Sequence, residues 1–353
     1  MLKSEQLKFF IKKTSHSIVD GRYHFLSNQT ASKVLQNIEK KKGKLNSNLK
    51  NQADIYAREI LGWKGFSPWL YVYSAISNTF REGWIPDNYY GKMVIPKIQG
   101  NYGKISSLKP LCNKILNDYV SPELVSYING FWFDKNLKPI NRSDIEKLVF
   151  SESSKVVCKL DQSYQGKDVF LFNCQNFDID FIEKKGNSII QNFIQQHQFF
   201  NNFTTSSVAT IRMTTVVDQM NKISLRACYL RLGRKYDTHV KSSSHIRIPI
   251  NLYDGSLQEE GYLTDWRTIC KHPDSLVGFS GKNVPQYDKC VRLVLKLHEN
   301  FPMVRCIGWD IIVDNKNKPV LMEWNGYSND IKFSEATQGP CFKDLNWHLL
   351  KKH

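Results

Sequence analysis

Hydrophobic residues at every second position dominate the sequence after residue 207, and this pattern restricts the possible folds more than any other feature. A two-residue period is typical of β-strands with one buried face. Segments 207–217 and 223–233 show it on either side of the polar loop DQMNK, and 245–253 and 308–325 show it again. Strands joined by short loops pair antiparallel. Together with an amphipathic helix at 286–301, the pattern predicts an α+β fold with antiparallel sheets.

The first part of the chain has a helical period instead. Apolar residues in 3–85 recur at three and four positions, in LKFFIKK, ASKVLQNIEKKKGKL and QADIYAREILGW. Gly43 and Gly62 are expected helix ends. Residues 87–110 contain glycines and prolines and are expected to form a loop. We therefore expect a mainly helical N-terminal region over residues 1–110.

Between these two patterns lies a mixed region. LCNKILNDYV (111–120) and NRSDIEKLVF (141–150) are predicted helices, and SPELVSYINGFWFD contains a short strand. KVVCKLDQSYQGKDVFLF (155–172) predicts a strand, a polar loop and a second strand. An apolar-periodic segment at 188–203 closes the region. We expect a middle part over 111–196 and a C-terminal part over 197–353.

The composition is that of a folded protein with a basic surface. The 353 residues carry 49 Lys and Arg against 33 Asp and Glu, a net charge of +16. Such a charge favours anionic partners, or it is simply a solvated basic surface. No segment approaches the roughly 18–20 apolar residues of a membrane span, and the N-terminus lacks the apolar core of a signal peptide. The eight cysteines form no CxxC pair, so reduced thiols in a cytoplasmic protein are expected, not a zinc site or disulfide scaffold.

The hairpin at 308–325 carries two carboxylates and an amide among apolar residues. A turn at Asn315–Lys318 places Asp310 opposite Glu323, with Asn325 two residues further on the same face. Facing carboxylates need a cation between them, and oxygen ligands of this kind suit Mg²⁺ or Mn²⁺. The alternative is a solvent-facing strand with chance acids or an Asp–Lys pair.

The segment VVCKLDQSYQGKDV places a lysine at the end of a predicted strand, and a glycine-containing loop follows it. Lys159 on the strand can neutralise phosphate charge, and the loop with Ser163, Gly166 and Lys167 can bring backbone N–H groups to phosphate oxygens. The segment is neither a Walker A loop nor a GxGxxG motif. An ordinary polar hairpin turn is the alternative.

Two further segments are candidates for ligand contacts. IIQNFIQQH (189–197) could hold an adenine edge through backbone groups, and the alternative is the start of a core helix. Arg212 and Arg226 fall on one face of the 207–233 hairpin if its loop centres near Met220, and like charges so placed need an anion. Arg231 and Arg234 are candidates to extend this patch. The alternative is a solvated basic face.

The order of these pieces resembles the ATP-grasp superfamily, and most of all its sugar-transfer-associated branch from bacterial surface-polysaccharide loci. The resemblance covers about residues 110–330. It implies two lobes with antiparallel sheets that clasp ATP: a small lobe at 111–196 and a catalytic lobe at 197–353. The matching stretches are INGFWFDKNLKPINRSDIEKL, VVCKLDQSYQGKDV, IIQNFIQQH, TIRMTT, CYLRLG and IGWDIIVDNKNKPVLMEWN.

The resemblance also implies roles for single residues. Lys159 would contact the α- and β-phosphates, and Arg212 and Arg226 would lie near the γ-phosphate or the acceptor carboxylate. The remaining assignments are Ser163, Gly166 and Lys167 to the phosphate loop, Gln191, Asn192, Phe193 and Ile194 to the adenine hinge, and Asp310, Glu323 and Asn325 to the metal.

This chain departs from the family pattern in several places. The loop QSYQGK is poor in glycine, the hinge has Gln191 where many relatives have Glu, and THVKSSSHIRIP lacks an expected Asp-Asn and paired glycines. Gly308 stands two residues before Asp310, where relatives place an arginine. An arginine that stabilises the transferring phosphate must therefore come from elsewhere.

The implied activity is an ATP-dependent carboxylate–amine ligase that uses a pair of Mg²⁺ ions and an acylphosphate intermediate. The implied substrates are a carboxylated sugar, such as a nucleotide- or lipid-linked uronic acid, and an amino acid or amine. Peripheral contact with the inner membrane face is compatible with such substrates. A kinase-like phosphotransferase is the main alternative, and a nucleic-acid-binding protein is a third, although the chain lacks a recognisable nucleic-acid-binding motif.

Overall fold

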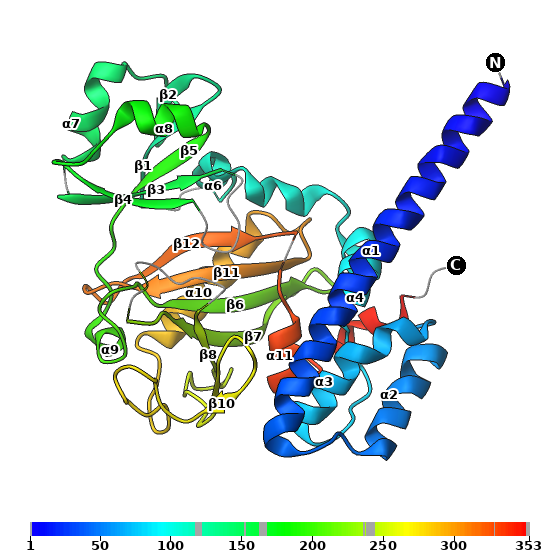
Figure 1. Ribbon diagram of the computed structural model, residues 1–353. Helices are drawn as coiled ribbons and strands as arrows, with labels where there is room; N and C mark the ends of the chain where they lie inside the picture. The colour runs from blue at the N-terminus through cyan, green and yellow to red at the C-terminus, as the bar shows by residue number, and fades with distance from the viewer. Residues whose placement is uncertain are drawn as a thin grey trace. The chain divides into compact units, whose positions relative to one another are not determined.

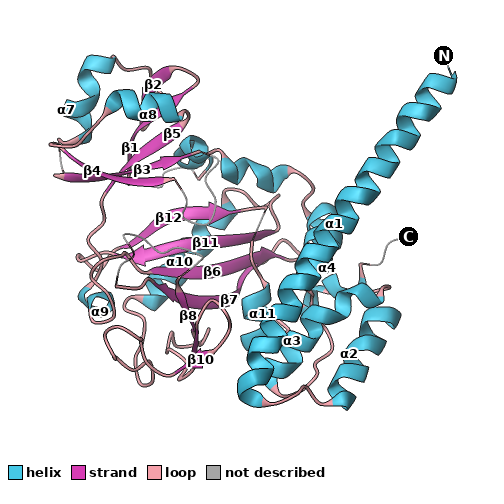
Figure 2. Cartoon of the chain, viewed as in Figure 1, coloured by secondary structure: helices cyan, strands magenta, loops and turns pink. Residues whose placement is uncertain are grey.

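The computed structural model describes residues 2–116, 122–151, 153–161, 168–235, 237, 244–327 and 329–350, with side chains from Val19 onward. The chain divides into two compact units. The first comprises Met1–Gly100, Asp265–Arg267 and Asp330–His353, and the second comprises Asn101–Thr264 and Thr268–Asn329. Figure 1 traces the chain from end to end, and Figure 2 separates the helical first unit from the strand-rich second one.

The first unit is helical, as the three- and four-residue period predicts. Its main helices are α1 (Leu2–Lys42), α2 (Ser47–Glu59), α3 (Ser67–Ser77) and α11 (Lys332–Thr337). Gly43 ends α1 with φ +86° and donates its N–H to the Glu39 carbonyl, so this predicted helix end is confirmed. Among the described helices, none combines the length and hydropathy of a membrane-spanning segment.

Residues 330–350 belong to this helical unit and not to the C-terminal lobe, where we expected them. The Trp84 indole donates to the Glu335 carbonyl oxygen at 2.8 Å, and the Ile85 N–H donates to the Glu335 carboxylate at 2.7 Å. Phe333 packs edge-on against Trp266, which supplies another piece of this unit. These contacts hold the last segment of the chain within the helical unit.

The segment from 87 to 115 is a series of short helical turns where we expected a loop and then a helix. α4 (Asp87–Tyr89), a π-turn (Tyr90–Val94) and α5 (Ile95–Ile98) precede two 3₁₀ turns and α6 (Cys112–Ile115), while residues 117–121 lie outside the described part. Buried Tyr89, Tyr90 and Val94 hold this segment in place, which its glycines and prolines did not indicate.

The second unit contains two antiparallel sheets. The smaller has the order β2-β1-β5-β3-β4. α7 and α8 cover one of its faces (Figure 1) around a core that includes Val156, Phe172 and Ile190. The element bounds are β1 (Glu123–Ile128), β2 (Phe131–Asp134), α7 (Ile145–Val149), β3 (Lys155–Leu160), β4 (Val169–Asn173), α8 (Ile179–Lys185) and β5 (Ser188–Asn192).

The larger sheet has seven strands in the order β10-β9-β8-β7-β6-β11-β12. α10 packs on one face, where Leu230, Ile246, Val294 and Ile311 share a buried core. The bounds are α9 (Gln198–Asn201), β6 (Thr210–Val217), β7 (Ile223–Leu232), β8 (Ile246–Pro249), β9 (Gly261–Tyr262), β10 (Thr268–Ile269), α10 (Tyr287–Glu299), β11 (Cys306–Val313) and β12 (Pro319–Asn325). The predicted α+β class with antiparallel sheets is confirmed.

Candidate functional site

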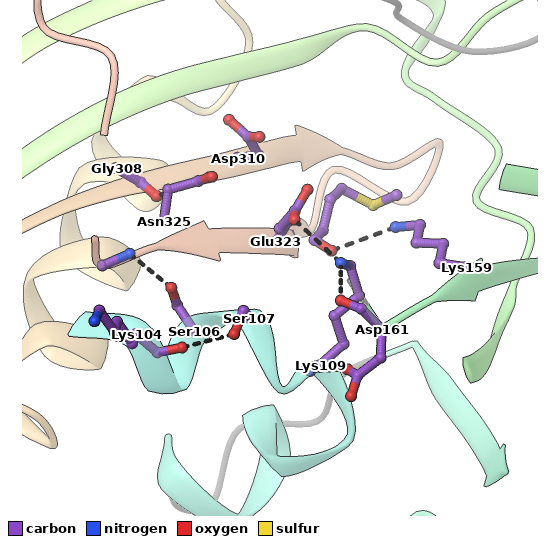
Figure 3. Close-up of polar contacts among 12 residues, drawn as sticks. Lys104, Ser106, Ser107, Lys109, Lys159, Asp161, Gly308, Asp310, Glu323 and Asn325 are labelled. Atoms are coloured by element: carbon purple, nitrogen blue, oxygen red, sulfur yellow. Dashed lines mark hydrogen bonds and ion pairs between the residues drawn. The ribbon is translucent and has the colours of Figure 1, made fainter. Parts of the chain in front are cut away.

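The β11–β12 hairpin has the predicted pairing at its acidic end. Asp310 pairs with Glu323, and Gly308 pairs with Asn325. A bulge after Asp310 shifts the rest of the ladder by one residue, so that Ile311 pairs with Leu321. In Figure 3, Asp310, Glu323 and Asn325 project from these two neighbouring strands. The hairpin therefore presents two carboxylates and one carboxamide together.

Asp310 is buried and held by two arginines. Arg212, opposite it on β6, contacts its two carboxylate oxygens from Nε at 2.6 Å and from Nη2 at 3.1 Å. Arg231 on β7 adds a contact of 2.5 Å from Nη2. Burial alone would raise the pKa of Asp310, but the positive charges of Arg212 and Arg231 outweigh it and lower the pKa to about 2. Asp310 is thus ionised at neutral pH.

Glu323 lies beside two lysines. Its Oε1 is 3.8 Å from Nζ of Lys109, and Nζ of Lys159 donates to the neighbouring Met322 carbonyl at 3.4 Å (Figure 3). Burial lowers the pKa of Lys159, while the charge of Glu323 acts to raise it. The strand lysine predicted from the sequence therefore reaches the acidic hairpin.

Lys109 was not predicted from the sequence. Its Nζ donates to the Asp161 carbonyl at 2.8 Å, and its backbone N–H donates to the Asp161 carboxylate at 2.7 Å. These bonds fix a buried lysine from a 3₁₀ turn against the end of β3. The segment before Pro110 has no periodic pattern. The position of Lys109 in the site depends on its contact with a distant segment, which the sequence does not indicate.

A second buried acid lies near Asp161. Burial, and then the charge of Asp161, raise the pKa of Glu123 to about 8. Asn113 donates to its carboxylate at 3.2 Å, and Glu123 pairs with Gln191 across β1 and β5. Glu123 was also not predicted, because the sequence around an acid at the start of a short strand does not show whether the side chain is buried or exposed.

The oxygen donors at the hairpin fit a hard divalent cation. Carboxylate and carboxamide oxygens are the ligands that Mg²⁺ prefers, and Mg²⁺ takes its remaining ligands from water and phosphates. The Asn325 carboxamide donates from Nδ2 to the Gly308 carbonyl at 3.4 Å, which orients its oxygen. Asp310 is ionised, as a metal ligand must be.

Asn329 and Arg212 fill the space around Gly308. A side chain at position 308 would place its Cβ 2.2 Å from Oδ1 of Asn329 and 3.2 Å from Nη1 of Arg212. Arg212 in turn donates from Nη1 to that Asn329 oxygen at 3.4 Å. The buried Asn329 is anchored by Thr214 and Cys306, at 3.4 and 3.6 Å. Gly308 thus leaves the space in which Asn329 orients the guanidinium of Arg212.

Gly308→Ala is expected to lower stability by about 1–3 kcal/mol, because the added methyl group must displace Asn329 or Arg212 in a packed site. Urea unfolding measures this. Gly21→Ala, on an exposed part of α1 with open space around it, is the control and should stabilise by up to about 1 kcal/mol. Wild-type stability in Gly308→Ala would contradict the close packing described above.

The other predicted arginine, Arg226, has a different position from that expected. The β6–β7 ladder shifts by one residue between Thr214 and Thr215, so Arg212 pairs with Tyr229. Arg226 donates from Nε to the Ser224 hydroxyl at 2.9 Å, whereas Arg231 reaches Asp310. Arg234 instead forms a bidentate pair with Asp274 at 2.8 Å. Of the residues predicted for the arginine patch, Arg212 and Arg231 therefore lie beside Asp310. The role predicted for Arg226 stays a prediction.

The predicted hinge residues lie at and after the end of β5 in the smaller sheet. Gln191 and Asn192 end β5, so a helix start there is wrong. The Asn192 N–H donates to the Pro122 carbonyl at 2.8 Å and the Phe193 N–H to the Lys155 carbonyl at 3.2 Å. These two backbone donors are therefore used within the protein, contrary to our expectation of free backbone groups. Ile194 follows the strand, and Ser163, Gly166 and Lys167 of the predicted phosphate loop lie outside the described residues.

Comparison with solved structures finds distant similarity to several enzymes. N5-carboxyaminoimidazole ribonucleotide synthetase from Thermotoga maritima is 9% identical with a TM-score of 0.41, and the match covers 80% of this chain and 62% of that one. D-alanine–D-alanine ligase from Bacillus anthracis, complexed with ATP, is 11% identical with a TM-score of 0.37, covering 65% and 57%. N5-carboxyaminoimidazole synthetase from Staphylococcus aureus, complexed with ADP, is 10% identical with a TM-score of 0.42, covering 71% and 52%. The chain thus spans less than two thirds of the length of each.

Comparison with curated protein sequences found no match. A family model does match: sugar-transfer associated ATP-grasp, over residues 134–346, more than half of the chain. The matched range contains Lys159, the two arginines that contact Asp310 (Arg212 and Arg231) and the whole β11–β12 hairpin. It confirms the resemblance and the fold expected from the sequence. The chain belongs to the sugar-transfer associated ATP-grasp family.

Proposed function

We propose that this protein is an ATP-dependent ligase that joins a carboxylate to an amine, with a carboxylated sugar of a bacterial surface polysaccharide as the acceptor. One observation carries the proposal most directly. Two carboxylates of the β11–β12 hairpin, Asp310 and Glu323, lie between cationic side chains. The lysines Lys109 and Lys159 lie on the side of Glu323, and the arginines Arg212 and Arg231 contact Asp310. Such an arrangement suits a polyphosphate held by lysines and metal, with its terminal phosphoryl group directed toward the arginines.

The residues of the site would have separate roles. Asp310, Glu323 and Asn325 would hold Mg²⁺, which neutralises charge on the transferring phosphoryl group. Lys159 and Lys109 offer positive charge to the other phosphates. Gln191 Oε1 and Asn192 Oδ1 are buried acceptors without a hydrogen-bond donor in the described structure, and the amino group of adenine could satisfy one of them.

The chemistry requires no general base in its first step, because a carboxylate is already a nucleophile at neutral pH. A carboxylate oxygen attacks the γ-phosphorus, the bond to the β–γ bridging oxygen breaks, and ADP leaves. An amine then attacks the acyl carbon, the C–O bond to phosphate breaks, and the nitrogen loses a proton. Arg212, oriented by Asn329, is placed to stabilise the charge that develops in the first step.

The direct test supplies ATP and Mg²⁺ with a uronic acid, with an amino acid, and with both. Release of ADP and phosphate that requires both substrates, together with an amide product seen by mass spectrometry, is expected. A stable phosphorylated product formed without amine would show a kinase instead.

Lys159→Gln is expected to weaken binding of Mg²⁺ with a non-hydrolysable ATP analogue by at least about tenfold, since a half-buried cation that would face phosphate is lost. Isothermal titration calorimetry measures this. Lys155→Gln, at the exposed end of the same strand, is the matched control. Equal affinities of the two variants for the analogue would show that Lys159 does not contact the nucleotide.

A further inference from the structure

The segment 102–111, which forms two 3₁₀ turns, lies along the end of β12 beside the candidate metal ligands (Figure 3). Gly326, which follows Asn325, donates its N–H to the Ser106 hydroxyl at 3.1 Å. A Cβ atom on Gly326 would lie 2.9 Å from the Gly103 carbonyl oxygen, so the two backbones are in close contact. The segment is therefore fixed to the end of the strand that carries the metal ligands.

The same segment is connected to the smaller sheet through Lys109. The backbone N–H of Lys109 donates to the Asp161 carboxylate at 2.7 Å, and its Nζ donates to the Asp161 carbonyl oxygen at 2.8 Å (Figure 3). The side chain is 8% exposed, and Nζ lies 3.8 Å from Oε1 of Glu323. A lysine has more rotamer freedom to lose than most side chains. Here one residue, Asp161, holds both the backbone and the ammonium group of the lysine.

Asp161 is in turn held by the smaller sheet. It directly follows β3, is 7% exposed, and donates its N–H to the Asn187 carbonyl oxygen at 2.9 Å. A buried carboxylate lowers stability unless its oxygens accept hydrogen bonds, and Oδ1 of Asp161 accepts the Lys109 N–H. Asp161 therefore links Lys109 to the end of a paired strand.

We propose that Asp161 is a positioning residue, which holds Lys109 where its ammonium group meets the phosphates of the nucleotide. This inference rests on the proposed function, in which Lys109 offers positive charge to the phosphates. A side chain that is ordered before the ligand binds has less rotamer freedom to lose on binding, and the affinity is higher for that reason. Asp161 would thus act on the nucleotide through Lys109, without contact of its own.

A purely electrostatic role of Asp161 would have the opposite effect. A carboxylate beside lysines that bind phosphate weakens the binding of phosphate, because like charges repel. Loss of the carboxylate should therefore weaken nucleotide binding if Asp161 positions Lys109, and strengthen it if Asp161 only repels the phosphates. Asparagine at this position removes the charge and keeps an oxygen that can accept the Lys109 N–H.

The test measures binding of Mg²⁺ with a non-hydrolysable ATP analogue to the full chain by calorimetry. Asp161→Ala should bind about tenfold more weakly than the wild type, and Asp161→Asn should recover most of this loss. Asp134→Ala is the matched control, because the Asp134 carboxylate also accepts backbone N–H groups, from Asn136 and Lys138 at 2.8 Å, in the turn after β2. It should bind as the wild type does. Unchanged or tighter binding in Asp161→Ala would overturn the inference.

A double-mutant cycle shows whether Asp161 acts through Lys109. Lys109→Met removes the ammonium group and keeps a long side chain. In this background Asp161→Ala should cause little further loss of affinity, because the group that Asp161 positions is already absent. A further loss of about tenfold would show that Asp161 supports the fold in general, and would overturn the inference. If Asp161→Ala does not fold, Asp161→Ser, whose hydroxyl is one atom shorter than the carboxylate, replaces it in the cycle.

Failure of the proposed function gives a different result. A wild type that binds the nucleotide analogue but shows no turnover that requires both acid and amine contradicts the ligase alone, since the affinities of the variants are measured without turnover. A wild type that does not bind the analogue contradicts the nucleotide site, and the role of Asp161 with it.

Discussion

Glu323→Gln is expected to lower ATP turnover by about a hundredfold or more while leaving the protein folded. The change keeps the size of the side chain and removes the charge that would hold the metal against the phosphates, an electrostatic contribution of this order in other enzymes. The side chain is 38% exposed and its contact with Lys109 is a long 3.8 Å, so little stability is lost. Steady-state release of ADP measures the effect.

The matched control is Glu299→Gln, at the exposed end of α10, where neither turnover nor stability should change. A melting temperature within a few degrees of the wild type shows that Glu323→Gln acts on chemistry and not on folding. Wild-type turnover in Glu323→Gln would mean that the hairpin acids do not hold a catalytic metal.

Asp310→Asn is expected to lower stability by about 3–5 kcal/mol and to abolish turnover. The carboxylate lies buried between two guanidinium groups, and removing one partner of a buried ion pair leaves the other charges without compensation. Urea unfolding measures the loss. The double variant Asp310→Asn/Arg231→Gln should recover part of it, because one of the stranded positive charges is also removed.

The pH dependence of stability gives an independent check on Asp310. Its pKa in the folded protein is about 2, below the ordinary value of 3.8, so the unfolded chain binds the proton more readily. The stabilisation is therefore fully present above about pH 4 and is lost as the pH falls toward 2. Wild-type stability should fall through this window, and Asp310→Asn should lack that component. Parallel pH profiles for the two proteins would contradict the ion pairs.

The sequence predicted the acidic hairpin well because its information is local. The polar residues at 315–318 mark the turn and the two-residue period marks the strands, and Asp310 faces Glu323 as expected. The bulge after Asp310 was not predictable, since an extra residue in one strand leaves no mark in composition. It lies between the turn and the acids: Val313 pairs with Pro319, one residue away from the predicted register, and the extra residue restores the predicted pairing at Asp310.

A second bulge had a larger effect on the predicted site. The shift between Thr214 and Thr215 moves every pair on one side of it, so Arg212 pairs with Tyr229, and Arg231, two residues further on, contacts Asp310. Lys109 and Asn329 were missed for another reason. Each lies in an irregular segment and becomes part of the site through contacts with residues more than 50 positions away in sequence. Periodicity carries no information about such contacts.

The division of the chain into units has a consequence for synthesis on the ribosome. The strands of both sheets are complete at Asn325, before the last segment of the helical unit is made. The helical unit is completed later, because Glu335, which receives hydrogen bonds from Trp84 and Ile85, is translated about 250 residues after them. Until then the N-terminal helices expose the aromatic surface that residues 330–350 will cover. The N-terminal helices are thus translated before the strands, but their unit is completed after them.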